Sequence, residues 1–148
     1  MQAILFIGIQ ASGKSTFYKE RFFNTHLRIS MDLLNTRNKE RQFLEKCIEL
    51  QQRLVIDNTN PSVAERARYI PKLKAAKYEV IGYYFQSDLA TAIRRNKQRK
   101  GKEKIPEVGI RSTFKKMELP KLKEGFDKLY EVKIVEDNFV VKNWNNEV

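Results

Sequence analysis

The segment from Gly8 to Ser15 reads G-x-x-x-x-G-K-S, which is the residue pattern of a loop that binds phosphate groups. Its glycines, Gly8 and Gly13, let successive backbone N–H groups turn toward a phosphate. Lys14 is placed to reach the β and γ oxygens of a nucleotide, and the Ser15 hydroxyl can hold Mg²⁺. The pattern therefore predicts a nucleotide site, and the alternative is a Gly/Ser turn with an unrelated lysine.

The chain on either side of this loop has the order that such a loop requires. Residues 3–7 form an apolar run typical of a buried strand, and Phe17, Phe22 and Phe23 supply the apolar positions of a helix that starts in the loop. The N-terminus of that helix favours negative charge beside the loop. Strand, loop and helix together favour the phosphate-binding interpretation over a simple turn.

Two carboxylates follow apolar segments further along the chain. Asp32 comes after residues 27–30, and Asp57 closes the apolar strand at residues 54–56. Asp57 has the position of an acid that holds Mg²⁺ directly or through water. Asp32 can either accept a proton from an attacking hydroxyl or cap the helical turn that follows it, and the spacing leaves both roles open.

The rest of the chain alternates between apolar strands and amphipathic helices. Strands are expected at residues 27–30, 54–57, 80–85, 132–135 and 139–141, and helices at about 40–52, 61–76, 87–99, 106–117 and 120–130. Asn60 is expected to cap the helix that Pro61 opens, and Pro71 to kink or interrupt it. This alternation predicts one α/β domain over residues 1–148, with a parallel sheet covered by helices on both faces and ligands at the carboxyl ends of the strands.

A basic segment at about residues 95–106 separates two of the expected helices. It contains a glycine and no apolar periodicity, so we expect it to form a basic lid near the phosphate-binding loop. Arg95 and Arg99 lie one helical turn apart and can project from one face toward nucleotide phosphates. For any single basic residue of this segment, a solvated surface position is the alternative.

The 148 residues carry a formal net charge of +11, from 29 Lys and Arg against 18 Asp and Glu. This balance favours a polyanionic partner such as nucleic acid over a neutral metabolite, although a solvated basic surface would give the same count. Cys47, the single cysteine, falls among apolar residues at helical spacing and is expected in the core. With no disulfide, signal peptide or transmembrane segment expected, the chain is predicted to work in the cytoplasm.

Four ordered blocks of the sequence resemble the 5′-hydroxyl polynucleotide kinases, in particular the kinase half of polynucleotide kinase-phosphatases and related small bacterial kinases. The blocks are Gly8–Thr16, Ser30–Asp32, Ile56–Pro61 followed by Arg66–Tyr69, and Arg95–Arg99 followed by Pro106. The third block is much more particular to this group than the loop is. The resemblance implies a P-loop NTPase fold that uses ATP, or another NTP, and Mg²⁺.

The resemblance also implies a reaction and a role for each matched residue. The γ-phosphate of ATP would pass to the 5′-OH end of RNA or DNA, with Asp32 as the general base. The implied roles are nucleotide binding by Gly8, Gly13, Lys14, Ser15 and Thr16, metal binding by Ser15 and Asp57, catalysis by Lys14, Asp32, Arg99 and Arg95, and acceptor binding by Asp32 and Arg37. No Asp-x-Asp phosphatase signature occurs, so no 3′-phosphatase activity is predicted.

Two other functions are compatible with the sequence. A kinase of a small-molecule hydroxyl would share the loop and the lid but would need no surplus of positive charge, and salt would not weaken its binding of the acceptor. A non-transferring, ATP-dependent nucleic-acid-binding switch would hydrolyse ATP in response to nucleic acid without labelling the strand. The sequence does not determine the oligomeric state.

Overall fold

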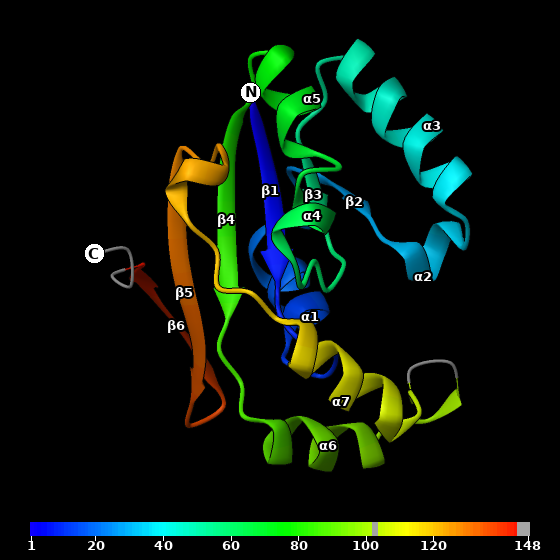
Figure 1. The fold of residues 1–148 in the computed structure, drawn as a ribbon, viewed down its shortest axis with the longest axis vertical. Coiled ribbons are helices and arrows are strands. Elements are labelled where there is room, and N and C mark those ends of the chain that lie inside the picture. Colours follow the sequence, from blue (N-terminus) through cyan, green and yellow to red (C-terminus); the bar gives the residue numbers. More distant parts are fainter. Residues whose placement is uncertain (102–103, 145–148) are drawn as a thin grey trace.

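The computed structural model describes residues 1–101 and 104–144 and is built around one six-stranded sheet (Figure 1). The strands lie in the order β2-β3-β1-β4-β5-β6 across the sheet. Their bounds are β1 Gln2–Ile7, β2 Leu27–Ile29, β3 Leu54–Ile56, β4 Glu79–Phe85, β5 Lys128–Val135 and β6 Asn138–Asn143. The first five strands run parallel, and β6 pairs antiparallel with β5. The predicted parallel α/β sheet is confirmed, with one antiparallel strand at its edge.

The described residues form seven α-helices, and the first follows β1 directly through the phosphate-binding loop. Their bounds are α1 Lys14–Arg21, α2 Met31–Leu34, α3 Arg37–Glu49, α4 Val63–Arg66, α5 Ile70–Ala75, α6 Leu89–Lys97 and α7 Glu107–Lys116. Figure 1 shows α3 beside α4 and α5, whereas α6 and α7 lie at the end of the sheet to which β1 points. The C-terminal end of β1 therefore faces a separate pair of helices.

Strand β1 is central because its side chains are apolar on both faces of the sheet. Residues 3–7 are at most 1% exposed, and β1 pairs with β3 on one side and β4 on the other. Leu5 belongs to the core cluster that contains Cys47 of α3, whereas Phe6 packs in a second cluster with Phe17 of α1. Because alternate residues of a strand point to opposite faces, helices cover both faces, as predicted, and Cys47 lies in the core.

The segment after β3 folds differently from the single capped helix that the sequence suggests. The side chain of Ser62, not Asn60, caps α4 by accepting a hydrogen bond from the Glu65 N–H at 3.2 Å. Asn60 has a left-handed backbone with φ 44°, and its buried side chain donates to the Phe6 carbonyl at 2.7 Å. The prediction of an Asn60 cap is therefore wrong, because Asn60 joins this segment to β1 instead.

The predicted interruption at Pro71 is present. Helix α4 ends at Arg66, and α5 begins at Ile70 with Pro71 in its first turn. Proline is accepted there because the first N–H groups of a helix have no partner within the helix. The segment thus consists of two short helices in place of one long helix.

The C-terminal third contains more strand than the sequence suggests. A helix was expected over residues 120–130, but only the 3₁₀ turn η2 at Leu122–Glu124 forms, and β5 already begins at Lys128. Gly125 ends the turn in a left-handed conformation with φ 116°. The expected hairpin is confirmed with longer strands, and its two turn residues, Glu136 and Asp137, have φ 50° and 63° as in a type I′ turn.

Helices α6 and α7 pack on each other and on the phosphate-binding loop. Ala92 of α6 and Ile110 of α7 share an apolar cluster with Ile9 and Ala11 of the loop. This packing fixes the basic segment at one end of the sheet, although Lys102 and Glu103 within the predicted lid lie outside the described residues. In the part of the chain that the structure describes, no helix has the length and apolar character needed to cross a membrane.

Candidate active site

The phosphate-binding loop holds its lysine in place through its own carbonyl groups. Lys14 begins α1, and its Nζ donates to the Gly8 carbonyl at 2.9 Å and to the Ile9 carbonyl at 2.8 Å. Gly13 caps the helix with φ 97°, and a Cβ there would lie 3.1 Å from a methyl group of Ile134. Both the backbone angle and the close approach of β5 therefore require glycine at position 13.

Burial changes the chemistry of this lysine. Removal from water lowers the pKa of Lys14 from 10.5 to about 8, because the charged ammonium loses hydration. Asp57 raises this pKa, Arg99 lowers it further and Asp32 raises it, so all three residues lie close enough to act on the ammonium. The negative charge of bound phosphate would favour the charged form of Lys14.

Asp57 lies at the end of β3 and is held by two donors. The Ser15 hydroxyl donates to its Oδ2 at 3.0 Å, and the Nε of Arg28 donates to the same oxygen at 2.8 Å. A second nitrogen of Arg28 donates to the Ser15 Oγ at 3.0 Å. The carboxylate is nearly inaccessible, with 2% of its side chain exposed, so the Arg28 guanidinium supplies the positive charge that its burial requires.

The oxygen atoms of Ser15 and Asp57 have the chemistry that Mg²⁺ prefers. Magnesium takes hard oxygen ligands, and it is usually bound by one or two protein side chains together with water and substrate phosphates. Among the described residues, no cluster of three His, Cys, Asp or Glu side chains could hold a metal ion. A hydroxyl and one carboxylate next to a phosphate-binding loop fit a cation that arrives with a nucleotide.

Asp32 lies in the first turn of α2 and is exposed at its surface. Ser30 caps this helix by accepting from the Asp32 N–H at 3.2 Å, and Asn58 accepts from the Met31 N–H at 2.9 Å. The interpretation of Asp32 as a helix cap is therefore wrong, because Ser30 occupies that position. The Asp32 carboxylate is left available to the space above the loop.

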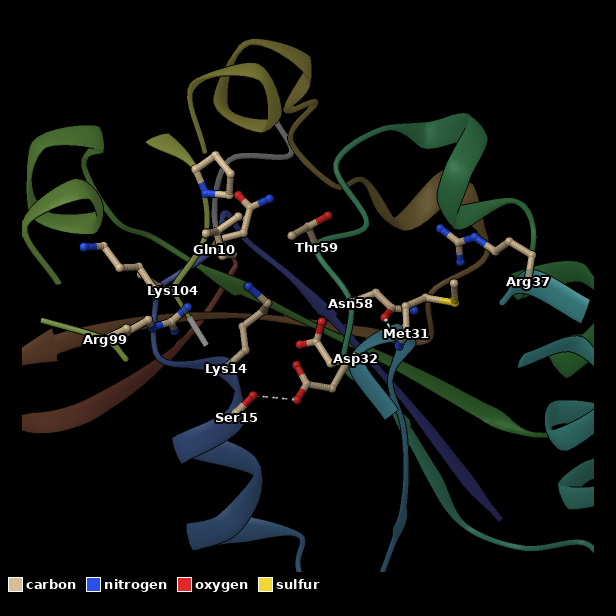
Figure 2. A pocket seen from close by; sticks show the side chains of 14 residues that line it. Gln10, Lys14, Ser15, Met31, Asp32, Arg37, Asn58, Thr59, Arg99 and Lys104 are labelled. Atoms are coloured by element: carbon tan, nitrogen blue, oxygen red, sulfur yellow. Dashed lines mark hydrogen bonds between the residues drawn. The ribbon is translucent and has the colours of Figure 1, made fainter. Parts of the chain in front are cut away.

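These residues border one cavity of about 500 Å³ (Figure 2). The side chains that line it include the predicted Lys14, Ser15, Asp32, Asp57, Arg37 and Arg99. In Figure 2, Lys14 and Asp32 point toward the same space, with Arg99 and Lys104 on one side of it and Arg37 on the other. The fold thus brings six predicted residues from distant parts of the sequence around one space.

Arg95 does not line the cavity that contains Asp32. It borders a neighbouring cavity of about 280 Å³ on the other side of the loop, together with Gly13, Thr16 and Asp137. Arg99 lines both cavities. The two arginines, one helical turn apart, therefore share the smaller cavity, and only Arg99 also reaches the larger one.

Arg37 lies at the edge of the larger cavity and is held by a buried polar network. Its Nη1 donates to the Glu40 carboxylate at 2.8 Å and to the Tyr69 hydroxyl at 3.0 Å. Tyr69 in turn donates to Glu40, and the Asn58 amide donates to the other Glu40 oxygen at 2.8 Å. Glu40 is only 2% exposed, so this network fixes the start of α3 against the end of β3.

Two site residues were missed by the sequence analysis: Arg28 and Gln10. The sequence could have indicated a role for Arg28, since it is a charged residue in the middle of a short apolar strand. Gln10 donates from its amide to the Thr113 hydroxyl at 2.9 Å, which connects the loop to α7, and its buried Oε1 has no hydrogen-bond partner among the described residues. Nothing in the local sequence indicates the partners of Gln10 or Asn58.

Asn96 also has a structural role that the sequence did not indicate. Its side-chain amide donates to the Ile105 carbonyl at 2.5 Å, and its Oδ1 accepts from the Ile105 N–H at 2.9 Å. These two hydrogen bonds of the buried Asn96 side chain close the base of the basic segment between α6 and α7. Arg99 and Lys104 are thereby held on the same side of the larger cavity.

The sheet, the loop and the two helical layers define the fold of the P-loop kinases. The crystal structure of Kti12 from Chaetomium thermophilum, in complex with ADP-AlF3, matches 88% of this chain and 88% of that chain, with a TM-score of 0.66 and 16% identity. A gluconokinase from Sinorhizobium meliloti 1021 matches 91% of this chain and 83% of its own, with a TM-score of 0.59 and 15% identity. Identities this low show the fold alone.

Residues 26–120, more than half of the chain, match the family model described as AAA domain. The chain therefore belongs to the AAA domain family. A bifunctional polynucleotide phosphatase/kinase of Schizosaccharomyces pombe is 25% identical over 135 residues, which are 88% of this chain and 33% of that protein. The predicted similarity to polynucleotide kinases is thus confirmed, and the chain spans about a third of the length of the curated relatives it matches.

Proposed function

We propose that this protein is a kinase that transfers the γ-phosphate of ATP to the 5′-OH end of RNA or DNA. One observation carries the proposal: the exposed carboxylate of Asp32 shares a cavity of about 500 Å³ with Lys14 and Arg99. A carboxylate next to two cations can accept a proton from a hydroxyl that attacks a phosphate. The similarity to the bifunctional polynucleotide phosphatase/kinase of Schizosaccharomyces pombe supports nucleic acid as the acceptor.

The donor would bind with its phosphates on the loop. The Lys14 ammonium would contact the β and γ oxygens, and Arg99 would approach the γ-phosphate from the side of α6. These cations would stabilise the charge on the transferring group, which supplies much of the rate in phosphoryl transfer. Arg95, which lines the cavity beside Gly13 and Thr16, would contact the nucleotide away from the γ-phosphate.

In the transfer step, the Asp32 carboxylate would take the proton of the 5′-hydroxyl. The electron pair of that oxygen forms the new bond to the γ-phosphorus, while the bond from this phosphorus to the β,γ-bridging oxygen breaks and ADP leaves. Asp32 then holds the proton until water removes it. Ser15 and Asp57 would hold Mg²⁺, which neutralises phosphate charge when it is bound.

Positive charge around the cavity supports a polyanionic acceptor. The chain has a net charge of +11, and Arg37, Arg99 and Lys104 all line the cavity that contains Asp32. A neutral small molecule would need no such surplus of cations. Arg37 would approach a phosphate of the acceptor, since part of its guanidinium is exposed while Glu40 and Tyr69 hold the rest.

The test is the transfer of γ-labelled phosphate from ATP, with Mg²⁺, to matched 5′-OH RNA and DNA oligonucleotides. Label should appear on the strand with the unchanged protein and be lost in both Lys14→Ala and Asp32→Asn. Glu49→Gln is a matched control, since it makes the same carboxylate-to-amide change on the exposed face of α3 and should transfer normally.

Two outcomes would contradict the proposal. ATP hydrolysis stimulated by nucleic acid, without label on either strand, would indicate a nucleic-acid-dependent switch. Label on a small hydroxyl compound but on neither strand would indicate a small-molecule kinase. A separate measurement of phosphate released from 3′-phosphorylated strands tests the prediction that this chain has no 3′-phosphatase activity.

A further inference from the structure

A second cavity, of about 360 Å³, lies between α3 and the α4–α5 segment. Its floor includes the buried side chains of Leu44 and Tyr69. Around this floor stand four cations, Arg37 and Arg41 from α3 together with Arg68 and Lys72 from the α4–α5 segment. We call this cavity the α3–α5 groove, and Figure 1 shows the two helical segments that border it next to one another.

The groove adjoins the catalytic cavity through one shared residue. Arg37 lines both cavities, and its hydrogen bonds to Glu40 and Tyr69 hold its guanidinium at the boundary between them. A ligand that reaches Asp32 and extends past Arg37 therefore enters the groove. The groove thus has the position of an extension of the acceptor site.

Two of the four cations of the groove are not neutralised within the described chain, whereas Arg37 pairs with Glu40 and Arg41 with Glu45. The carboxylate of the groove, Glu40, is buried and already accepts hydrogen bonds from Arg37, Tyr69 and Asn58. The side chains of Arg68 and Lys72 are exposed and make no hydrogen bond or ion pair within residues 1–101 and 104–144. Cations over an apolar floor complement the phosphates and sugars of a nucleic-acid strand.

Arg68 belongs to the Arg66–Tyr69 block of the sequence, in which the neighbouring side chains have structural roles. Arg66 is fully buried and forms a two-bond ion pair with Glu124, at 2.8 and 3.1 Å, so its role is to tie α4 to η2. Tyr69 belongs to the Glu40 network. The side chain of Arg68, between them, makes no hydrogen bond or ion pair in the described chain, and it lines the groove. Its charge is available to a ligand.

We propose that the acceptor strand leaves the catalytic cavity along the α3–α5 groove, where Arg68 and Lys72 bind backbone phosphates on the 3′ side of the reacting nucleotide. This inference rests on the proposed function, because it needs a nucleic acid at Asp32. The groove would then make a strand a better acceptor than a single nucleotide. Binding through backbone phosphates depends on salt and tolerates any sequence.

The experiment compares the unchanged protein with the double variant Arg68→Gln, Lys72→Gln. Acceptors are a nucleoside 3′-monophosphate and a single-stranded 5′-OH oligonucleotide of about 10 nucleotides. The double variant should raise the KM for the oligonucleotide relative to that for the mononucleotide about tenfold at low salt. In fluorescence anisotropy with the same oligonucleotide, the slope of log Kd against log salt should become shallower by about 1.4, for two single-strand phosphate contacts.

The matched control is Lys19→Gln, Lys142→Gln, which removes the same charge from exposed positions on α1 and β6. If the control changes the oligonucleotide KM and the salt slope as much as the groove variant does, only net charge matters and the inference is wrong. If the groove variant transfers phosphate to the oligonucleotide with an unchanged KM, the strand leaves by another route while the proposed function stands. If the unchanged protein labels and binds no oligonucleotide, both fail.

Discussion

The two sides of the proposed catalytic cavity, a donor side around Lys14 and Asp57 and an acceptor side around Asp32 and Arg37, differ in burial and in how their charges are paired. On the donor side, Lys14 and Asp57 are buried, and their polar atoms are held by the loop carbonyls, Ser15 and Arg28. On the acceptor side, Asp32 is exposed and the α3–α5 groove has unpaired cations. A buried and paired site can fix one invariant group, whereas an open site admits a polymer. The difference fits the proposed reaction, in which the donor always presents the same triphosphate group and the acceptor strand varies in sequence.

The largest effect is expected from Asp32, the exposed carboxylate on the acceptor side. Asp32→Asn should lower kcat about 10³-fold, because an amide cannot accept the proton of the attacking hydroxyl. ATP binding should not weaken, since the substitution removes a negative charge close to the phosphates. Single-turnover transfer and equilibrium binding of a fluorescent ATP analogue measure the two effects. A kcat within tenfold of the unchanged protein would assign the base to another group.

The next largest effect is on the stability of the fold, and it concerns the buried ion pair of the donor side. Arg28→Gln leaves the buried Asp57 carboxylate without its ion-pair partner, which should lower the free energy of unfolding by about 2 kcal/mol. ATP with Mg²⁺ should raise the Tm of this variant more than that of the unchanged protein, because a bound cation would compensate the same carboxylate. Thermal unfolding with and without the nucleotide tests this. Equal Tm values without nucleotide would show that Asp57 does not depend on Arg28.

A smaller effect is expected for Arg37, because Glu40 and Tyr69 already occupy part of its guanidinium. Arg37→Gln should raise the KM for a 5′-OH strand about tenfold at low salt and leave the KM for ATP unchanged. Steady-state kinetics with each substrate varied in turn give the two constants. Arg53→Gln, which removes an arginine at an exposed position outside the cavity, serves as the control. An effect on the KM for ATP alone would place Arg37 on the donor side.

The smallest effect is the uptake of protons by Lys14 when ATP binds. The pKa of Lys14 is lowered to about 8 by burial, so without nucleotide the ammonium loses its proton as the pH rises through this value. Bound phosphates raise that pKa again, and the complex therefore holds more protons than the free protein above pH 8. ATP binding should take up a fraction of a proton at about pH 9 and almost none at about pH 6.5. Calorimetry in buffers of different ionisation enthalpy measures this uptake, and no uptake at the higher pH would contradict it.

The donor side could be predicted from the sequence because most of its geometry is local. Gly8, Gly13, Lys14 and Ser15 lie within eight residues, and the apolar runs on either side fix the strand and the helix that hold them. The prediction that Asp57 lies at the site also used the topology of the sheet. The carboxyl ends of parallel strands lie at the same edge, so an acid at the end of a buried parallel strand lies at the edge that carries the loop. The partner of Asp57, Arg28, was missed, because only the pairing of β2 with β3 brings the two residues together.

The acceptor side was harder to predict because its contacts connect segments that are distant in the sequence. Arg37 meets Tyr69 across 32 residues, and Asn58 meets Glu40 across 18. The cap of α4 was misassigned to Asn60 for the same reason, since its hydrogen bond to Phe6 spans 54 residues. Helical periodicity places Arg95 and Arg99 on one face, but only the packing of α6 on the loop decides that Arg99 reaches the cavity of Asp32 and Arg95 does not.

The sequence by itself determined that the chain has a phosphate-binding loop, a parallel α/β sheet and carboxylates at the ends of its strands. These features depend on local backbone preferences and on apolar periodicity, which act over a few residues. Only the tertiary structure decided that Ser30, and not Asp32, caps α2, that Arg28 pairs with Asp57, and that Arg68 stands in a groove next to the active site. Those contacts depend on how helices and strands pack, and packing joins residues whose separation along the chain carries no local signal.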